Sequence, residues 1–278
     1  ALSLRETNRP EEARETFEDW FSRVGSSTTR WYGLWTQYAV TVHILGDYDR
    51  ELEVARWARE ELQGGDLELL EAEGRALAGR GELEPIWPLA SEIASSSGAG
   101  TEPGWVLADL AAELRAHGAA DASLRMLDQA RTWHAALSKE QRRSVDGRLL
   151  LGTLLYRGDQ WGEADDVWTS LVSDSLPLAV EVRVEGRLGA AAAREGDTDR
   201  AEQLARHLAT LGNPELNGSG TLARARIAAL LGNETEAVDL LRRAFSEGVA
   251  YGIWIHRDVD LEPLRDDPAY QELVRPKG

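Results

Sequence analysis

The sequence predicts an all-α protein, an α-solenoid of about six to seven helix hairpins with a C-terminal capping segment. Two observations carry this prediction. Short glycine-containing turns recur about every 35 to 40 residues along the 278-residue chain. On both sides of each turn, apolar residues recur with the spacing of a helix face, as in Leu107–Leu114 and Leu124–Ala130 around Gly118. A fixed period of this length is typical of repeat architectures.

The turns set the order of elements along the chain. Each turn is expected to join a first helix to a second one, near residues 8, 46, 81, 118, 158, 196 and 232. Glycine ends a helix in the left-handed conformation without steric cost, and the Asp or Asn that follows can cap the next helix. Pro10 and Pro85 suit the first turn of a second helix, because proline loses no hydrogen bond there. We therefore expect a repeat array over residues 1–248 and a C-terminal cap over residues 249–278.

Small residues occupy two fixed positions in this repeat. Seven residues before the turn stand Ala39, Gly74, Ala111, Gly189 and Ala225, with Gly152 in a unit that is shifted by one residue. Five residues after the turn stand Ala13, Ser123, Ala201 and Ala237, with Ala164 in the shifted unit. A small side chain at a contact lets two helix axes approach closely. The two positions predict where each hairpin packs against itself and its neighbours.

With these residues the chain resembles the tetratricopeptide repeat (TPR) family. Trp35, Tyr38 and Ala39 with Gly46-Asp47-Tyr48 give the best single match, whereas Glu51 and Ile86 stand where the pattern has a small residue. The resemblance implies a right-handed superhelix whose first helices line a concave groove. The ending from Asp260 to Leu273 is similar to that of bacterial TPR regions fused to protein kinase, nucleotide cyclase or winged-helix regulator domains. Because Ala1 begins inside a helix, we expect a longer parent protein.

The composition argues against several classes of protein. Lys and Arg total 31 against 48 Asp and Glu, a formal net charge of −17, which disfavours nucleic acid and anionic membrane surfaces as partners. No apolar run is long enough to span a membrane. There is no cysteine for a disulfide or a thiolate metal site. We expect a cytoplasmic protein.

No sequence motif predicts an enzyme, a metal or a cofactor. The five histidines are scattered along the chain without an HExxH pattern, and Gly-Lys-Ser/Thr is absent. His256-Arg257-Asp258 matches the tripeptide of a kinase catalytic loop, but the rest of that loop is missing. The carboxylate pairs Asp165-Asp166 and Asp266-Asp267 are interpreted as solvated helix faces. We expect no catalytic residues and no metal site.

The ten tryptophans are the one compositional excess. Trp20, Trp35, Trp87, Trp133 and Trp168 fall at positions expected to pack between helices. Trp31, Tyr32 and Trp105 lie near the starts of first helices, where the TPR resemblance implies exposure to the groove. Aromatic side chains in such places are frequent interface hot spots.

The resemblance also selects the groove residues, which are Thr36, His43, Glu71, Arg75, Trp105, Arg115, Asp146, Tyr156, Arg183 and Arg226. Four arginines there would reverse the sign of charge locally. One hypothesis is an acidic peptide or C-terminal carboxylate in the groove, because the guanidinium fork matches a carboxylate. The alternative is that these arginines pair with Glu71, Asp146 and neighbouring acids.

These observations favour a non-enzymatic protein-interaction module, a scaffold within a larger bacterial signalling protein that binds a protein or peptide. A second possibility is a sensor domain that binds a small molecule or peptide and controls a fused effector. A third is an all-α toroid hydrolase, which would require chain ends that meet and opposed carboxylates.

Overall fold

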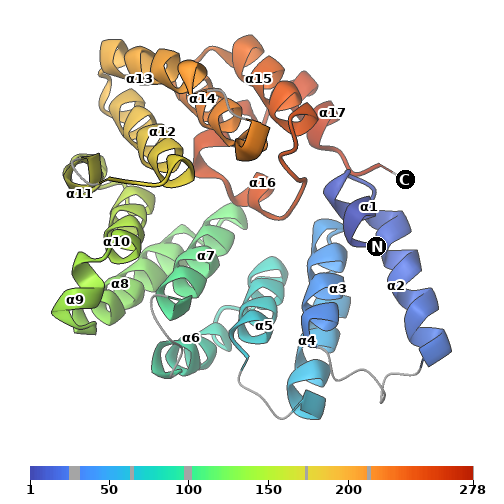
Figure 1. The fold of residues 1–278 in the computed structure, drawn as a ribbon. Helices are drawn as coiled ribbons and strands as arrows, with labels where there is room; N and C mark the ends of the chain where they lie inside the picture. The colour runs from blue at the N-terminus through green and yellow to red at the C-terminus, as the bar shows by residue number, and fades with distance from the viewer. Residues whose placement is uncertain (25–31, 63–65, 97–101, 173–174, 212–213, 278) are drawn as a thin grey trace. The chain divides into compact units, whose positions relative to one another are not determined.

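The computed structural model describes residues 1–24, 32–62, 66–96, 102–172, 175–211 and 214–277 (Figure 1). Every regular element in these ranges is a helix, which confirms the all-α class. The chain divides into two compact units. Unit 1 contains Ala1–Trp133, Tyr251–Arg257 and Arg275–Gly278, and unit 2 contains His134–Ala250 and Asp258–Val274. Each unit is described separately.

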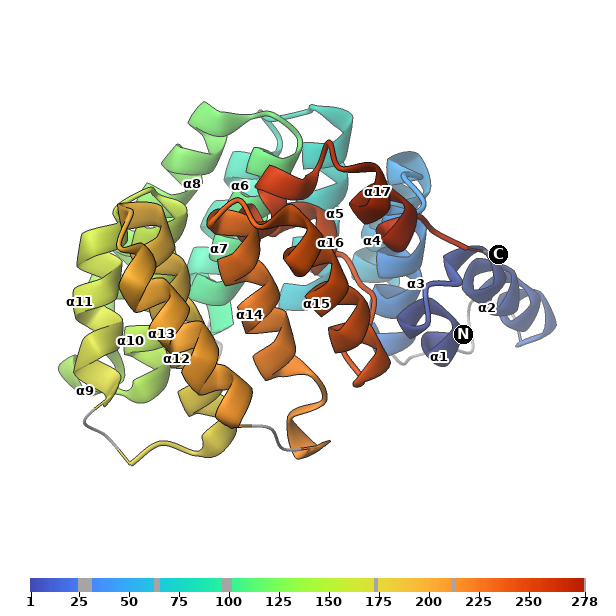
Figure 2. The same cartoon turned by 90° about the horizontal axis from the view of Figure 1, so that it is seen from above.

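Unit 1 is built from consecutive antiparallel helices, with α4 packed on both α3 and α5, and α5 packed on α7 (Figures 1 and 2). Its helices are α1 (Leu2–Glu6), α2 (Pro10–Val24), α3 (Tyr32–Ile44), α4 (Tyr48–Leu62), α5 (Leu67–Arg80), α6 (Ile86–Ser95), α7 (Glu102–Ala116), α8 (Ala120–Ala136, shared with unit 2 from His134 onward) and α16 (Trp254–Arg257).

Unit 2 follows the same plan, and α12, α13, α14 and α15 lie side by side in both views (Figures 1 and 2). Its elements are α9 (Lys139–Arg143), α10 (Val145–Arg157), α11 (Trp161–Val172), α12 (Leu178–Glu195), α13 (Thr198–Thr210), the 3-10 helix η2 (Pro214–Leu216), α14 (Ser219–Leu230), α15 (Glu234–Ser246), the 3-10 helix η3 (Val259–Leu264) and α17 (Pro268–Val274).

A residue with left-handed backbone joins two helices at each of the seven expected turns. Five of these residues are Gly46, Gly81, Gly118, Gly196 and Gly232, with φ between 71° and 81°. The other two are Asn8 (φ 62°) and Asp159 (φ 59°), and Gly158 beside Asp159 has φ −92°. The turn residue has therefore moved by one position in the α10–α11 hairpin, which agrees with the shifted register in the sequence.

The small residues lie where helices meet most closely. Ala39, Ala111, Ala225, Ala13, Ala164, Ala201 and Ala237 are fully buried. Ser123 on α8 donates from Oγ to the carbonyl of Ala111 on α7 at 2.7 Å, so the two small positions of one hairpin touch directly. At Gly74 an added Cβ would come within 2.8 Å of Leu110, and at Gly152 it would overlap the indole of Trp168. These positions set the helix spacing within each unit.

The prediction that five tryptophans pack between helices is confirmed in part. Trp35 and Trp168 are buried and Trp87 and Trp133 are half-buried, but the prediction that Trp20 packs in the core was wrong, because its side chain is 37% exposed. Along α2 the inward face is taken by Phe17 and Phe21, one helical turn apart, and Phe21 stacks on Trp35 with ring centroids 4.1 Å apart. Trp31 lies outside the described residues, as does the side chain of Tyr32.

The residues expected to form a C-terminal cap are divided between the two units. Residues Tyr251–Arg257 and Arg275–Gly278 belong to unit 1, where α16 packs on α7. There the chain ends meet. Asn8 donates from Nδ2 to the carbonyl of Arg275 at 2.8 Å, and the backbone N–H of Lys277 donates to the carbonyl of Asn8 at 2.9 Å. Among the described helices, none is long and apolar enough to cross a membrane.

Candidate functional site

Unit 1 brings three of the five histidines together around one carboxylate. His43 is the penultimate residue of α3, Glu113 lies in the last turn of α7, and His117 directly follows that helix. His256 lies on α16. The Nε2 atoms of His43, His117 and His256 are 3.0, 3.0 and 2.8 Å from Oε1 of Glu113. One ligating atom from each of the four residues lies within 4.8 Å of all the others. We call these four residues the histidine–glutamate cluster.

A second carboxylate holds His43 from its other side. His43 Nδ1 is 2.6 Å from Oε2 of Glu51 on α4, and Arg75 on α5 donates from Nε to Oε1 of Glu51 at 2.7 Å. The side chains of His43, Glu51 and Arg75 are all almost completely buried. This chain of contacts fixes the orientation of the His43 ring.

Further ion pairs surround the cluster. Arg257 on α16 donates to Asp109 at 3.0 Å and to Glu71 at 3.4 Å, and Arg75 lies 3.6 Å from Glu71. The short helix α16 thus contributes a histidine to the cluster and an arginine to the acids of α5 and α7.

In this network, burial and the neighbouring charged groups shift the pKa of each side chain in opposite directions. Burial works to raise the pKa of Glu113, but hydrogen bonds from His117, His256 and His43 hold that pKa well below its usual value. Burial works to lower the pKa of His43, but Glu51 and Glu113 outweigh it and raise the pKa. In His256 burial prevails, and the pKa is lowered despite Glu113. The cluster therefore favours an ionised Glu113.

Unit 2 contains a separate network around two aspartates of its C-terminal segment. Tyr156 on α10 donates to Asp260, and Arg194 on α12 donates to the Tyr156 hydroxyl at 3.0 Å. Arg226 on α14 donates from Nε to Asp258 at 2.7 Å. Burial, with the charge of Asp260, raises the pKa of Tyr156 well above its usual value, so the phenol stays protonated and donates.

A cavity of about 360 Å³ opens beside this network, between α12 and α14. We call it the arginine pocket. Its charged lining consists of Arg183, Arg187, Arg226 and Asp260. Val182, Leu222 and Ala223 contribute buried apolar surface. Cavities with mostly apolar walls and a few charged groups are the usual form of a ligand site.

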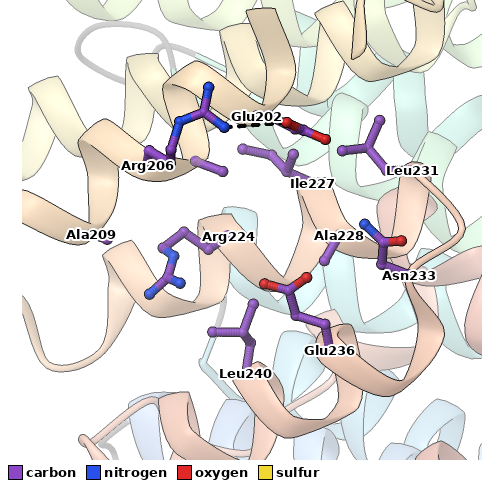
Figure 3. A pocket seen from close by; sticks show the side chains of 11 residues that line it. Glu202, Arg206, Ala209, Arg224, Ile227, Ala228, Leu231, Asn233, Glu236 and Leu240 are labelled. Atoms are coloured by element: carbon purple, nitrogen blue, oxygen red, sulfur yellow. Dashed lines mark hydrogen bonds and ion pairs between the residues drawn. The ribbon is translucent and has the colours of Figure 1, made fainter. Parts of the chain in front are cut away.

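A second cavity, of about 290 Å³, lies between α13, α14 and α15 (Figure 3). In Figure 3 the Glu202–Arg206 ion pair occupies one side, and Arg224, Glu236 and Leu240 occupy the other. Its two arginines face two glutamates, so this cavity has no strong preference for one sign of charge.

The structure distributes the ten groove residues predicted from the sequence among several places. His43, Glu71 and Arg75 meet in the network of unit 1, whereas Tyr156 and Arg226 meet around the aspartates of unit 2. Arg183 and Arg226 line the arginine pocket. Of the remaining four residues, Thr36 is buried and donates to the carbonyl of Gly33 in its own helix. Trp105 and Arg115 are half-buried on α7, and Asp146 is exposed on α10.

Sequence reasoning missed the histidine–glutamate cluster. His43 and His256 are 213 residues apart, so no local spacing connects them. One signal was present: Glu51 occupies the position where most of the other hairpins have Ala or Ser. A carboxylate at a position that packs against another helix must be buried, and a buried carboxylate needs partners.

The fold and these sites define the class as an all-α protein of helix hairpins with two buried polar networks. No known family model matches the sequence. No curated protein matches it either.

Proposed function

We propose that this chain is a TPR-like, non-enzymatic interaction module of a larger signalling protein, and that its arginine pocket binds acidic side chains of a peptide or protein. The observation that carries this proposal is the contact between Arg226 and Asp258. Here an arginine of α14 binds the carboxylate of Asp258, a residue of the C-terminal segment that belongs to the same unit. The surface next to that contact therefore already accommodates an acidic segment.

Two further arginines in the pocket are placed to bind a carboxylate. Arg183 is exposed and forms no ion pair with any residue that the structure describes. Arg187 lies 3.9 Å from Asp260, which is beyond hydrogen-bond distance. A guanidinium offers two parallel N–H donors to a carboxylate, so Arg183 and Arg187 together could hold one or two acidic side chains. In a chain of net charge −17, this local excess of arginine supports an acidic ligand.

The apolar wall of the pocket indicates which residues a ligand should carry beside its acidic ones. Val182, Leu222 and Ala223 lie beside the arginines, so the best ligand has an apolar residue next to its acidic ones. A peptide of this kind satisfies both the charges and the buried apolar surface.

The test is fluorescence anisotropy with labelled peptides in which acidic residues flank a Leu or Ile. Control peptides replace each Asp and Glu by Asn and Gln. Arg183→Glu and Arg187→Glu are expected to raise the Kd about tenfold or more, since a hydrogen bond between charged groups contributes roughly 1.5–3 kcal/mol. The matched control is Arg242→Glu on α15, an exposed arginine of the same unit that pairs with Asp239. Equal binding by Arg183→Glu, Arg187→Glu and Arg242→Glu would refute the proposal.

A small anionic ligand is the second candidate, favoured by the cavity volume of about 360 Å³. That value lies within the range of about 300–1,000 Å³ usual for small-molecule sites. Thermal stabilisation by free dicarboxylates that is lost in Arg183→Glu, together with no peptide binding, would select the sensor over the interaction module.

A further inference from the structure

We propose that His43, Glu113, His117 and His256 bind a divalent transition-metal ion, with Zn²⁺ as the ion that fits this donor set best. The site lies entirely in unit 1. It is independent of the arginine pocket of unit 2, so either proposal can fail without the other.

The positions of the donor atoms support the proposal. In a tetrahedral zinc site with bonds of about 2.0–2.1 Å, the ligand atoms lie roughly 3.3 Å from one another. Here Nε2 of His43 is 3.0 Å from Oε1 of Glu113 and 3.5 Å from Nε2 of His256. The four donors lie within 4.8 Å of each other, so a small rotation of the two half-exposed histidines, His117 and His256, would complete the polyhedron.

Hydrogen bonding alone leaves this arrangement poorly satisfied. Three imidazole nitrogens crowd one oxygen of Glu113, although a carboxylate oxygen has two lone pairs. The other oxygen, Oε2, is buried and accepts no hydrogen bond from the residues described. A metal ion accepts lone pairs from all four side chains at once, which removes the competition among three donors for one acceptor.

The second layer around His43 is the kind that metal sites use. A ligating histidine usually donates its other ring N–H to a carboxylate, which fixes the tautomer and directs a lone pair at the metal. Glu51 accepts from Nδ1 of His43, and Arg75 in turn orients Glu51. In the neutral, metal-binding form of His43, Nε2 carries the lone pair, and this atom lies 3.0 Å from Oε1 of Glu113 and 3.5 Å from Nε2 of His256.

The local charge also favours a cation. The ion-paired set around the cluster contains four carboxylates, of Glu51, Glu71, Asp109 and Glu113, and two guanidinium groups, of Arg75 and Arg257. A ligating imidazole is neutral, so in the metal-bound state a divalent ion offsets the two excess negative charges of this set. Burying an unbalanced charge is costly, so this balance stabilises the bound state.

The donor set selects the metal and its role. Three imidazoles and a carboxylate suit Zn²⁺, whereas Mg²⁺ and Ca²⁺ prefer oxygen ligands only. All four positions of a tetrahedron are supplied by the protein, which is the pattern of a structural site. The ion would tie α16 to α3 and α7, and so hold the C-terminal segment against the hairpins of unit 1.

The test measures Zn²⁺ binding to the full chain by calorimetry and by metal analysis after dialysis. We expect one ion per chain and a rise in Tm with Zn²⁺ concentration. His117→Ala and His256→Ala remove half-exposed ligands, so both variants should fold, which circular dichroism checks. Each should weaken binding by at least the 10- to 100-fold that loss of an outer partner typically causes. The control is His207→Ala, an exposed histidine of unit 2 that pairs with Glu185.

A second measurement separates this site from binding by isolated surface histidines. Co²⁺ in place of Zn²⁺ gives much more intense visible absorption bands in tetrahedral than in octahedral coordination. Those bands should appear in the wild-type chain and in His207→Ala and be absent in His256→Ala. Binding and spectra that are the same in the wild type and in the His117→Ala and His256→Ala variants would overturn the proposal.

Discussion

Arg75 donates from Nε to Oε1 of Glu51 at 2.7 Å, with both side chains buried between α4 and α5. Glu51 stands five residues after Gly46, where most of the other hairpins carry Ala or Ser. A single departure from the repeat pattern therefore introduces a charge between the helices, and Arg75 and His43 are the groups that neutralise it.

Removing Arg75 should destabilise the fold strongly. Arg75→Ala leaves Glu51 buried without its guanidinium, and breaking a buried pair from one side typically costs about 3–5 kcal/mol. Urea unfolding measures the loss. Arg80→Ala is the matched control on the same helix, because its ion pairs with Asp49 and Glu82 lie at the surface. Arg80→Ala should unfold close to the wild-type midpoint, and a loss as large as that of Arg75→Ala would contradict the prediction.

The same substitution should have opposite effects at two helical glycines of unit 2. At Gly152 an added methyl overlaps the fully buried Trp168, and such overpacking costs typically 1–3 kcal/mol. At Gly220 the nearest atom to an added Cβ is 3.7 Å away, so Gly220→Ala should stabilise by roughly 0.4–1 kcal/mol. Thermal unfolding of both variants is the measurement. A destabilised Gly220→Ala would show that α14 is packed more tightly than the structure indicates.

The hydroxyl of Tyr156 should contribute to the stability of the fold separately from the packing of its ring. Tyr156→Phe removes the donor to the buried carboxylate of Asp260 and the acceptor for Arg194. Hydrogen bonds to charged groups contribute roughly 1.5–3 kcal/mol, and a loss in that range is expected in chemical denaturation. Tyr48→Phe is the control, because the Tyr48 hydroxyl makes no hydrogen bond to any residue described. Similar losses in both variants would contradict a specific role for the Tyr156 hydroxyl.

The contribution of His134 to the free energy of unfolding should decrease as the pH drops below 6.5. Burial lowers the pKa of His134 from its ordinary 6.5, opposed by its 2.9 Å hydrogen bond to the carbonyl of Gly147. The folded chain then binds fewer protons than the unfolded chain below that pH, so protonation favours unfolding. The stabilisation is complete above pH 6.5 and is lost as the pH falls through the lowered value.

The measurement is the free energy of unfolding at several pH values on both sides of 6.5. His134→Gln should show a shallower decrease toward acid than the wild type. His207→Gln, which replaces an exposed histidine of the same unit, controls for the exchange of histidine for glutamine itself. Parallel curves for wild type and His134→Gln would rule out His134 as the source of the dependence.

The local features of the hairpins were predictable because each depends on a few neighbouring residues. The left-handed turns at Gly46, Gly81, Gly118, Gly196 and Gly232 follow from the absence of a Cβ, and the buried small residues follow from the repeat. Trp20 was placed wrongly because hydrophobicity alone does not decide which of several aromatic residues on α2 faces inward.

The polar sites were not predictable in the same way. His43, Glu113 and His256 come from α3, α7 and α16, and no periodicity of the chain relates them. Arg226 was selected for a groove, but the sequence could not show that Asp258 of the same chain would bind it. Electrostatic pairing depends on which side chains packing brings within a few ångströms, irrespective of their separation in sequence.

By itself the sequence determined the helical class, the positions of the turns and the small residues that set helix spacing, because backbone sterics and helical periodicity act over short distances. Only the tertiary structure decided that α16 brings His256 to Glu113 in unit 1, and that Asp258 and Asp260 meet Arg226 and Tyr156 in unit 2. The reason is physical: a buried charge is stabilised by whichever partners the completed packing supplies.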